Sequence, residues 1–363
     1  MTSKEQVDLD NEQTYADLDG EEMRARIREL PEQCADAWAL TRQMSLPFDT
    51  ATIRQVAILG MGGSAIGGAL LAALAADICA VPISIVGGYD LPAHVQRDAL
   101  VIASSYSGRT EETLCALAQA ETRGCPIVVV TAGKEWATHA AGKGWPVALF
   151  DYRASPRAAL GYSFTLLLGI LCRLGLLPDQ SAALEEAIAL LRERQEEWLP
   201  QRPTAQNPAK LLAQRLAGHL PVVYGAGFLA PVARRWKGQF NENSKNWAFW
   251  EELPELNHNA VVGYVSPAWM RQRCRVLFLR SPLDPPRIQL RWQVTGELLA
   301  QAKVPVEVVW GYGENRLAQM LSLIHYGDYV SLYLAMLNRA NPTQVAPIDY
   351  LKKRLAEARE TPC

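Results

Sequence analysis

Short apolar segments that alternate with glycine- or serine-rich turns and helical patterns constrain the fold of this chain most strongly. In the first half, the apolar segments lie at 56–59, 83–86, 100–103, 126–130 and 146–149. Helical patterns lie between them at 65–76 and 110–123. Apolar strands in this arrangement are typical of a mostly parallel sheet covered by helices on both faces, joined by right-handed crossovers. The sequence therefore predicts an α/β fold.

The same order of elements returns in the second half, with expected strands at 221–224, 275–279 and 306–309. We interpret this as two similar α/β domains, one of them changed in its loops; two unrelated α/β domains are the alternative. The 363 residues suit two domains of ordinary size. The expected parts are an acidic, loosely ordered tail at 1–20, a first domain at 21–198, a linker with three prolines at 199–208, and a second domain at 209–363 that ends in two helices.

Composition limits the possible partners. A hydrophobic share of 49% with a net charge of −2 is typical of a soluble globular protein and favours neither nucleic acid nor an anionic membrane as partner. The seven cysteines are odd in number and lack C-x-x-C spacing, so neither a disulfide framework nor a zinc site is expected. We predict a metal-free protein without a cofactor, located in the reducing cytoplasm.

The first candidate binding loop is the glycine-rich segment 60–68, Gly-Met-Gly-Gly-Ser-Ala-Ile-Gly-Gly, between a strand and a helix. Its glycines let the backbone approach a ligand, and the free N–H groups of a helix start favour an anion. The alternatives are a tight turn packed under the helix, or a dinucleotide site of the G-x-G-x-x-A type. A dinucleotide site needs an acid at the end of the second strand, where this chain has Gly87 and Gly88.

The second candidate loop follows the third strand and reads Ser-Ser-Tyr-Ser-Gly-Arg-Thr at 104–110. Hydroxyl groups, a glycine and a helix N-terminus form a neutral cradle for a phosphate dianion. The alternative is a capped helix with Thr110 as the cap. Because both loops leave the carboxyl ends of strands in one sheet, they converge where such sheets bind ligands. The sequence thus favours a phosphate site.

These loops, Gly-Gly-Ser at 62–64 and Ser-Tyr-Ser-Gly-x-Thr-x-Glu-Thr at 105–113, resemble the sugar isomerase (SIS) domain. Four further motifs are similar to those of the bifunctional phosphoglucose/phosphomannose isomerases. They are Pro-Arg-Ala-Ala-Leu-Gly-Tyr at 156–162, Asn-Glu-Asn-Ser-Lys at 241–245, Glu-Leu-Pro-Glu-Leu-Asn-His-Asn at 252–259, and Pro-Ile-Asp-Tyr-Leu-Lys-Lys at 347–353. The resemblance extends from about residue 20 to the C-terminus.

The resemblance implies an active site in the cleft between two SIS-like domains and at the interface of a homodimer. The residues implied to hold the sugar phosphate are Gly63, Ser64, Ser105, Ser107 and Thr110. Glu242 is implied as the base that moves a proton between C1 and C2, and His258, reaching in from the partner subunit, as the residue that assists ring opening. Arg157 would stabilise the enediolate, with Arg153 as the weaker choice, and Lys352 would lie near the ring oxygen, with Lys353 as its alternative. Thr343 is a further candidate for a hydroxyl near C2.

The implied activity is aldose–ketose isomerisation of glucose 6-phosphate and mannose 6-phosphate to fructose 6-phosphate through a cis-enediol. A carboxylate can take and return the proton, histidine can deliver one near neutral pH, and a guanidinium can stabilise the enediolate. Three residues depart from the expected pattern: Ala69, Arg109 and Ala260. Two other functions stay open: isomerisation of a different phosphosugar, and binding of a phosphosugar by a non-catalytic sensor.

Overall fold

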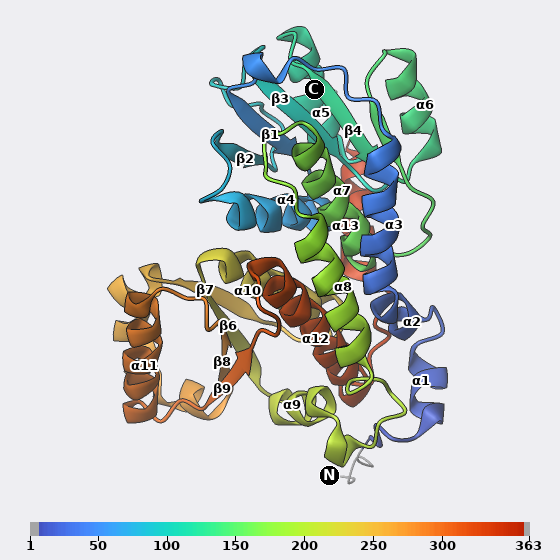
Figure 1. Ribbon diagram of the computed structural model, residues 1–363. Helices are drawn as coiled ribbons and strands as arrows, with labels where there is room; N and C mark the ends of the chain where they lie inside the picture. The colour runs from blue at the N-terminus through green and yellow to red at the C-terminus, as the bar shows by residue number, and fades with distance from the viewer. Residues whose placement is uncertain (1–6, 359–363) are drawn as a thin grey trace. The chain divides into compact units, whose positions relative to one another are not determined.

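The computed structural model describes residues 7–358 of the chain and divides it into two compact units (Figure 1). We call residues 29–188 the N-terminal unit, and residues 7–28 with 189–358 the C-terminal unit. The division falls within α8 (Ser181–Gln195), N-terminal to the stretch predicted as a linker. The units therefore differ at their ends from the domains predicted at 21–198 and 209–363.

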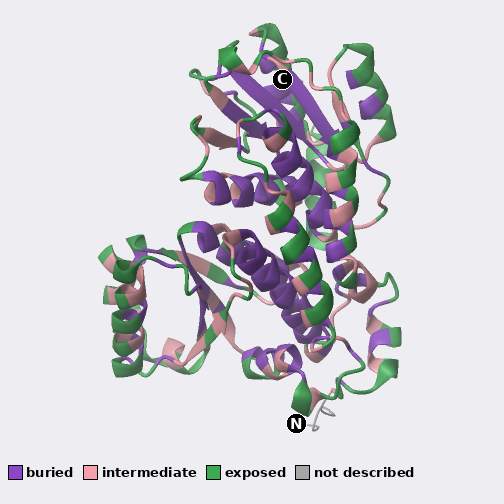
Figure 2. Ribbon diagram, viewed as in Figure 1, coloured by how far each residue is buried: buried purple, intermediate pink, exposed green. Residues whose placement is uncertain are grey.

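The N-terminal unit is built on a five-stranded parallel sheet in the order β2-β1-β3-β4-β5. Its strands are β1 (Gln55–Leu59), β2 (Ile83–Val86), β3 (Ala99–Ser104), β4 (Ile127–Thr131) and β5 (Val147–Leu149). All residues of β3 and β4 are buried, as strands covered on both faces must be (Figure 2). The predicted α/β class and the five predicted strands are confirmed.

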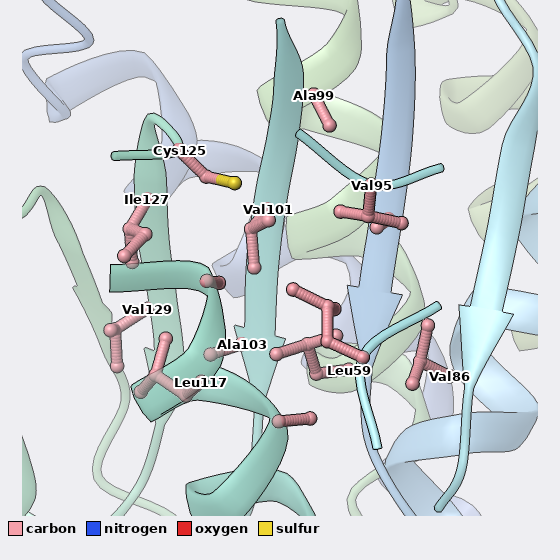
Figure 3. Packing of buried hydrophobic residues seen from close by; sticks show 14 of the residues in the cluster. Leu59, Val86, Val95, Ala99, Val101, Ala103, Leu117, Cys125, Ile127 and Val129 are labelled. Carbon is pink, nitrogen blue, oxygen red and sulfur yellow. The ribbon is translucent and has the colours of Figure 1, made fainter. Parts of the chain in front are cut away.

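Alternate strand residues pack beneath helices on one face of this sheet. Leu59, Val101, Ala103 and Val129 point to the same side as Leu117 of α5 (Glu111–Thr122), as Figure 3 shows. The other face is covered by α4 (Gly62–Ala75) and α7 (Leu160–Arg173), with α3 (Leu30–Gln43) packed against α7. A small helix, α6 (Lys134–Gly142), follows β4. Because helices cover both faces of the sheet, the ends of β1 and β3, which lead into the candidate loops, are held in place.

The C-terminal unit repeats the arrangement with a four-stranded parallel sheet in the order β7-β6-β8-β9. Its strands are β6 (Leu220–Ala226), β7 (Phe249–Leu253), β8 (Cys274–Arg280) and β9 (Val306–Trp310). The second strand of each unit lies outside the first, and the third and fourth follow on the other side, which supports the internal repeat. The strand β7 was not predicted, because its sequence, Phe-Trp-Glu-Glu-Leu, carries adjacent glutamates at the sheet edge.

Helices of the C-terminal unit are α1 (Glu12–Leu18), α2 (Met23–Arg28), α9 (Pro208–Leu216), α10 (Ala230–Glu242), α11 (Pro286–Gln301), α12 (Arg316–Leu337) and α13 (Ala346–Glu357). The helix α12 lies in the core of this unit, because every residue from Leu317 to Met336 is buried. Its polar residues stand at every third position and bond to other parts of the unit. They are Gln319, Ser322, His325, Asp328 and Ser331.

The loosely ordered tail predicted at 1–20 is wrong for residues 7–20, and residues 1–6 lie outside the described residues. Leu9 and Tyr15 are buried, and the Tyr15 hydroxyl donates to the Leu9 carbonyl at 2.8 Å. The stretch 199–208 is also held in place, since the buried Lys210 ammonium donates to the Pro200 carbonyl at 2.7 Å and to Asp10 at 2.8 Å. The buried side chains of Leu9, Tyr15 and Lys210 thus order two segments whose composition is mostly polar.

No helix within residues 7–358 combines the length and the apolar character that a membrane span requires.

Candidate active site

The first candidate binding loop places the start of α4 directly against a one-turn helix, η2 (Pro156–Ala158). A Cβ atom added to Gly63 would lie 2.8 Å from the Pro156 carbonyl oxygen and 3.1 Å from the Arg157 nitrogen, so only glycine fits there. Gly62, just before it, has a positive φ of 52°. Ser64 is buried and lines a small pocket together with Tyr106 and Pro156. The glycines therefore join the loop to the segment that carries Arg157.

The second candidate binding loop is folded around the Ser105 hydroxyl. This oxygen accepts the Gly108 N–H at 3.1 Å and lies 3.0 Å from the Thr110 hydroxyl. Gly108 has a positive φ of 66°, and an added Cβ would lie 2.5 Å from Cβ of Trp136. Ser107 is exposed at the rim, where its hydroxyl accepts the Arg109 N–H at 3.2 Å. The loop thus places two paired hydroxyls inside and one outside.

Neither helix that begins at these loops is capped by a side chain. Thr110 occupies the N-cap position of α5, yet its hydroxyl makes no capping bond to the helix and turns to Ser105 instead. Met61 precedes α4 and offers no cap either. The simple capping interpretation of Thr110 is therefore wrong. Uncapped N–H groups beside hydroxyls form a receptor for an anion.

Arg157 is 5% exposed, whereas Arg153 is exposed. Both ends of the segment that carries Arg157 are anchored within the N-terminal unit. The Tyr106 hydroxyl accepts the Ala154 N–H at 2.9 Å, and Gln33 of α3 donates to the Ala158 carbonyl at 2.8 Å. The sequence interpretation missed Gln33, which has no motif around it. The buried side chain of Arg157 suits a role in charge stabilisation better than the exposed Arg153 does.

Glu242 is the last residue of α10 and is half-buried. Its backbone carbonyl accepts a hydrogen bond from the Lys245 ammonium at 2.8 Å. Lys245 itself has a positive φ of 51°, which turns the chain sharply after the helix. Glu242 therefore lies at the end of a helix, and the chain that follows it is held by Lys245.

His258 is exposed at the end of the one-turn helix η5 (Glu255–His258), which follows β7. The residues on either side of it are fixed. Asn257 donates to the Thr295 hydroxyl at 2.9 Å and accepts from Arg291 at 2.9 Å, and Asn259 accepts the Ala260 N–H. An exposed imidazole on an anchored backbone is suited to acting on a group outside its own unit.

The remaining candidates lie near the end of the described chain. Lys352 and Lys353 belong to α13, whose residues are all exposed, and the Lys353 ammonium lies 3.9 Å from the Glu357 carboxylate. The Thr343 N–H donates to the Asn341 side chain at 2.8 Å. The two candidate binding loops and Arg157 thus belong to the N-terminal unit, while Glu242, His258, Lys352 and Thr343 belong to the C-terminal unit.

The corresponding loop of the second sheet is unsuited to phosphate. After β8, the Ser281 hydroxyl donates to Gln319 and accepts the Leu283 N–H, so it is used within the protein. The Asp284 carboxylate accepts from the indole of Trp292 at 3.0 Å, and burial raises the pKa of Asp284. A carboxylate at this position repels an anion. The loop after β8 therefore offers a buried carboxylate where the loop after β3 offers the Ser105–Thr110 hydroxyl pair.

Two parallel α/β units, one of them with hydroxyl-lined loops over uncapped helices, define a protein of the SIS phosphosugar-binding class. Residues 205–355 match the family of the bacterial phospho-glucose isomerase C-terminal SIS domain. The chain is 40% identical to the bifunctional phosphoglucose/phosphomannose isomerase of Caldicellulosiruptor bescii, over 92% of this chain and 99% of that protein. The chain belongs to the family of bifunctional phosphoglucose/phosphomannose isomerases.

Further comparisons agree with this assignment. The protein of the same name from Aquifex aeolicus is 34% identical over 85% of this chain and 92% of its own length. Among solved structures, the C-terminal domain of glucosamine-fructose-6-phosphate aminotransferase from Francisella tularensis superposes with a TM-score of 0.70 and 14% identity, over 89% of this chain and 98% of that chain. The latter likeness shows the fold.

Proposed function

We propose that the protein interconverts glucose 6-phosphate and mannose 6-phosphate with fructose 6-phosphate by proton transfer between C1 and C2. Relatives named for both isomerase activities, similar over nearly the whole chain, support this proposal. A cytoplasmic location is part of the same proposal.

The observation that carries the proposal is the Ser105–Thr110 hydroxyl pair at the uncapped start of α5. Hydroxyls and backbone N–H groups hold a phosphate dianion without a fixed positive charge, so the product can leave. Gly63, Ser64 and Ser107 complete this cradle in the proposal. A phosphate held there anchors one end of the sugar and leaves C1 and C2 to the catalytic groups.

The chemical steps are assigned to four side chains. His258 delivers a proton to the ring oxygen and opens the sugar. The Glu242 carboxylate then takes the proton from C2 of the aldose and returns it to C1, while the hydroxyl proton of O2 passes to O1, giving the ketose. Arg157 stabilises the negative charge of the enediolate between these steps, and Lys352 acts near the ring oxygen. In this proposal the residues supply binding, orientation, charge stabilisation and proton transfer at the ring oxygen and between C2 and C1.

A homodimer with His258 contributed across the interface is part of the proposal. The segment after His258 exposes large apolar side chains: Val262 is 77%, Val265 66% and Trp269 64% exposed. Trp247, two residues before β7, is 71% exposed. Several exposed apolar groups near one another are typical of a protein contact surface, and a second copy of this chain is the partner that the exposed His258 requires.

The test is incubation of the purified protein with fructose 6-phosphate in heavy water, with chelator present, followed by NMR alongside Glu242→Gln. The proposal expects glucose and mannose 6-phosphate with deuterium at C2, and no product from the variant. Their ratio shows whether both activities are present. Binding without turnover would instead favour the phosphosugar sensor, and neither binding nor turnover would point to a different phosphosugar.

A further inference from the structure

The helix that ends in Glu242 is fastened to α12 along one face. Arg235 and Gln239, one turn apart on α10, both donate to the Asp328 carboxylate, at 2.6 Å and 2.9 Å. Because residues 3, 4, 7 and 8 positions apart share a helix face, Glu242 and Asn243 continue this same face. The contact with α12 therefore leads directly to the proposed base.

Close packing makes this face specific. An added Cβ on Gly327 would lie 2.2 Å from the Trp236 indole, so the two helices meet at a glycine. The Trp236 indole N–H donates to the Leu323 carbonyl at 2.9 Å. Arg235, Gln239 and Asp328 are at most 5% exposed. Buried polar groups of this kind hold one arrangement, because any other arrangement leaves them without partners.

A second set of bonds clamps the residues that follow Glu242. The Asn243 amide donates to the Ser331 hydroxyl at 2.9 Å, and that hydroxyl donates to the Asp328 carbonyl at 2.7 Å. The Ser244 hydroxyl donates to the Ser331 carbonyl at 2.8 Å. Asn243, Ser244 and Ser331 are all fully buried. Ser331 thus accepts hydrogen bonds from both residues that follow Glu242: its hydroxyl accepts from Asn243 and its backbone carbonyl accepts from Ser244.

Such a clamp matters at this position because Glu242 is the last residue of its helix. Final helical turns lack partners for their carbonyl groups and fray. A general base has to stay within about 1 Å of its working position, since a misplacement of that size costs roughly 100-fold in rate. Residues that hold the end of α10 therefore control the chemical step more than they control the binding of the sugar phosphate.

We propose that Ser331, supported by Asp328 one turn earlier on α12, is a positioning residue that fixes the end of α10 and with it the Glu242 carboxylate. This inference rests on the proposed role of Glu242 as the base. It adds a second layer to the active site: α12 contributes no group to the sugar, yet it sets where the proton acceptor stands.

The experiment compares Ser331→Ala with Ser322→Ala in the full-length protein. Both serines are fully buried on α12, but the Ser322 hydroxyl bonds to Tyr312 and to the Gln319 carbonyl, whereas the Ser331 hydroxyl bonds to Asn243 at the end of α10. We expect Ser331→Ala to lower kcat roughly 10- to 100-fold with KM for fructose 6-phosphate within about twofold. The isotope effect on kcat with C2-deuterated glucose 6-phosphate should rise, because proton transfer becomes the slow step. Ser322→Ala should lower the melting temperature comparably and keep kcat and the isotope effect.

Asn243→Ala cuts the same bond from the α10 side and carries the same expectation if Ser331→Ala does not fold. Wild-type kcat in both of these variants, or an equal kcat loss in Ser322→Ala, overturns the positioning role. If that result comes with an inactive Glu242→Gln, the proposed function stands and only Ser331 loses its role. A wild-type protein without turnover overturns both proposals.

Discussion

The hydroxyl of Thr110 lies 3.0 Å from that of Ser105 and leaves the N-terminus of α5 without a side-chain cap. A threonine at this position ordinarily turns its hydroxyl to the helix N–H groups. Here the local helix loses that bond, and the loop gains a pair of hydroxyls beside free N–H groups. This arrangement supports the proposed binding of the sugar phosphate.

Thr110→Val should therefore weaken substrate binding while costing little stability. Loss of a hydrogen bond to a charged group is worth about 1.5–3 kcal/mol, which corresponds to a rise in KM for fructose 6-phosphate of roughly 10- to 100-fold. The free energy of unfolding should fall by less than the ~1 kcal/mol that removal of a working cap costs. Thr122→Val at the other end of α5 is the control, since its hydroxyl donates only to the Ala118 carbonyl. An unchanged KM in Thr110→Val contradicts the phosphate cradle.

Gly63→Ala tests the contact between α4 and the Arg157 segment. The added Cβ meets the Pro156 carbonyl at 2.8 Å, so the backbone of η2 has to shift. We expect kcat and kcat/KM to fall together and stability to drop by about 1–3 kcal/mol, the usual cost of overpacking. Gly142→Ala, where no atom lies within 4 Å of the new Cβ, should be neutral or stabilising. Steady-state kinetics and urea unfolding of both variants measure these effects. A wild-type kcat in Gly63→Ala would contradict a catalytic role for Arg157.

Subunit complementation tests whether His258 acts across an interface. Glu242→Gln and His258→Ala should each be inactive alone. When the two are co-refolded, half of the dimers are mixed, and each mixed dimer has one site free of both substitutions, so activity should recover to about a quarter of the wild-type value. Activity that stays at the level of the single variants means that His258 serves its own subunit, or that the chain is not a dimer.

His325 makes stability dependent on pH. The imidazole is fully buried on α12, its Nε2 lies 2.9 Å from the Ile27 carbonyl, and burial lowers its pKa to about 3. The unfolded chain takes up a proton at His325 near pH 6.5, while the folded chain does not. Stability is therefore complete above about pH 6.5 and falls as the pH drops toward 3, by up to about 1.4 kcal/mol per pH unit from this group.

Urea unfolding between pH 5 and pH 8 measures this dependence, with His325→Gln as the comparison. The variant is less stable at pH 8, and its stability should change less between pH 6.5 and pH 5 than that of the wild type. His219 is partly exposed and provides the control: His219→Gln should keep the wild-type slope. Equal slopes for wild type and His325→Gln would falsify the buried neutral histidine.

Much of the N-terminal unit could be predicted because its strands are short apolar runs punctuated by glycine and serine. The strand β7 (Phe249–Leu253) was not predicted, because it forms by pairing with β6 and its sequence does not alternate between apolar and polar residues. The ordering of residues 7–20 escaped because it depends on Tyr15 packing against Tyr333, far away in sequence.

The candidate site shows the same limit. The candidate binding loops were proposed from their glycines and hydroxyls, but the pairing of Ser105 with Thr110 follows from loop geometry that Gly108 and Trp136 impose. The roles of Glu242 and His258 came from a family resemblance, because a helix-end glutamate and a loop histidine look ordinary in one sequence. Gln33 and Ser331 carry no local pattern, and only the folded chain connects them to Arg157 and Glu242.

The most direct test of the account is deuterium incorporation at C2 of the aldose phosphate that forms from fructose 6-phosphate in heavy water. Wild type and Glu297→Gln, which alters an exposed helix glutamate of the same unit, should give glucose and mannose 6-phosphate labelled at C2. Glu242→Gln should reduce the rate of labelling by at least about 100-fold. Labelled product from Glu242→Gln at the wild-type rate would contradict the account, because another group would then be moving the proton.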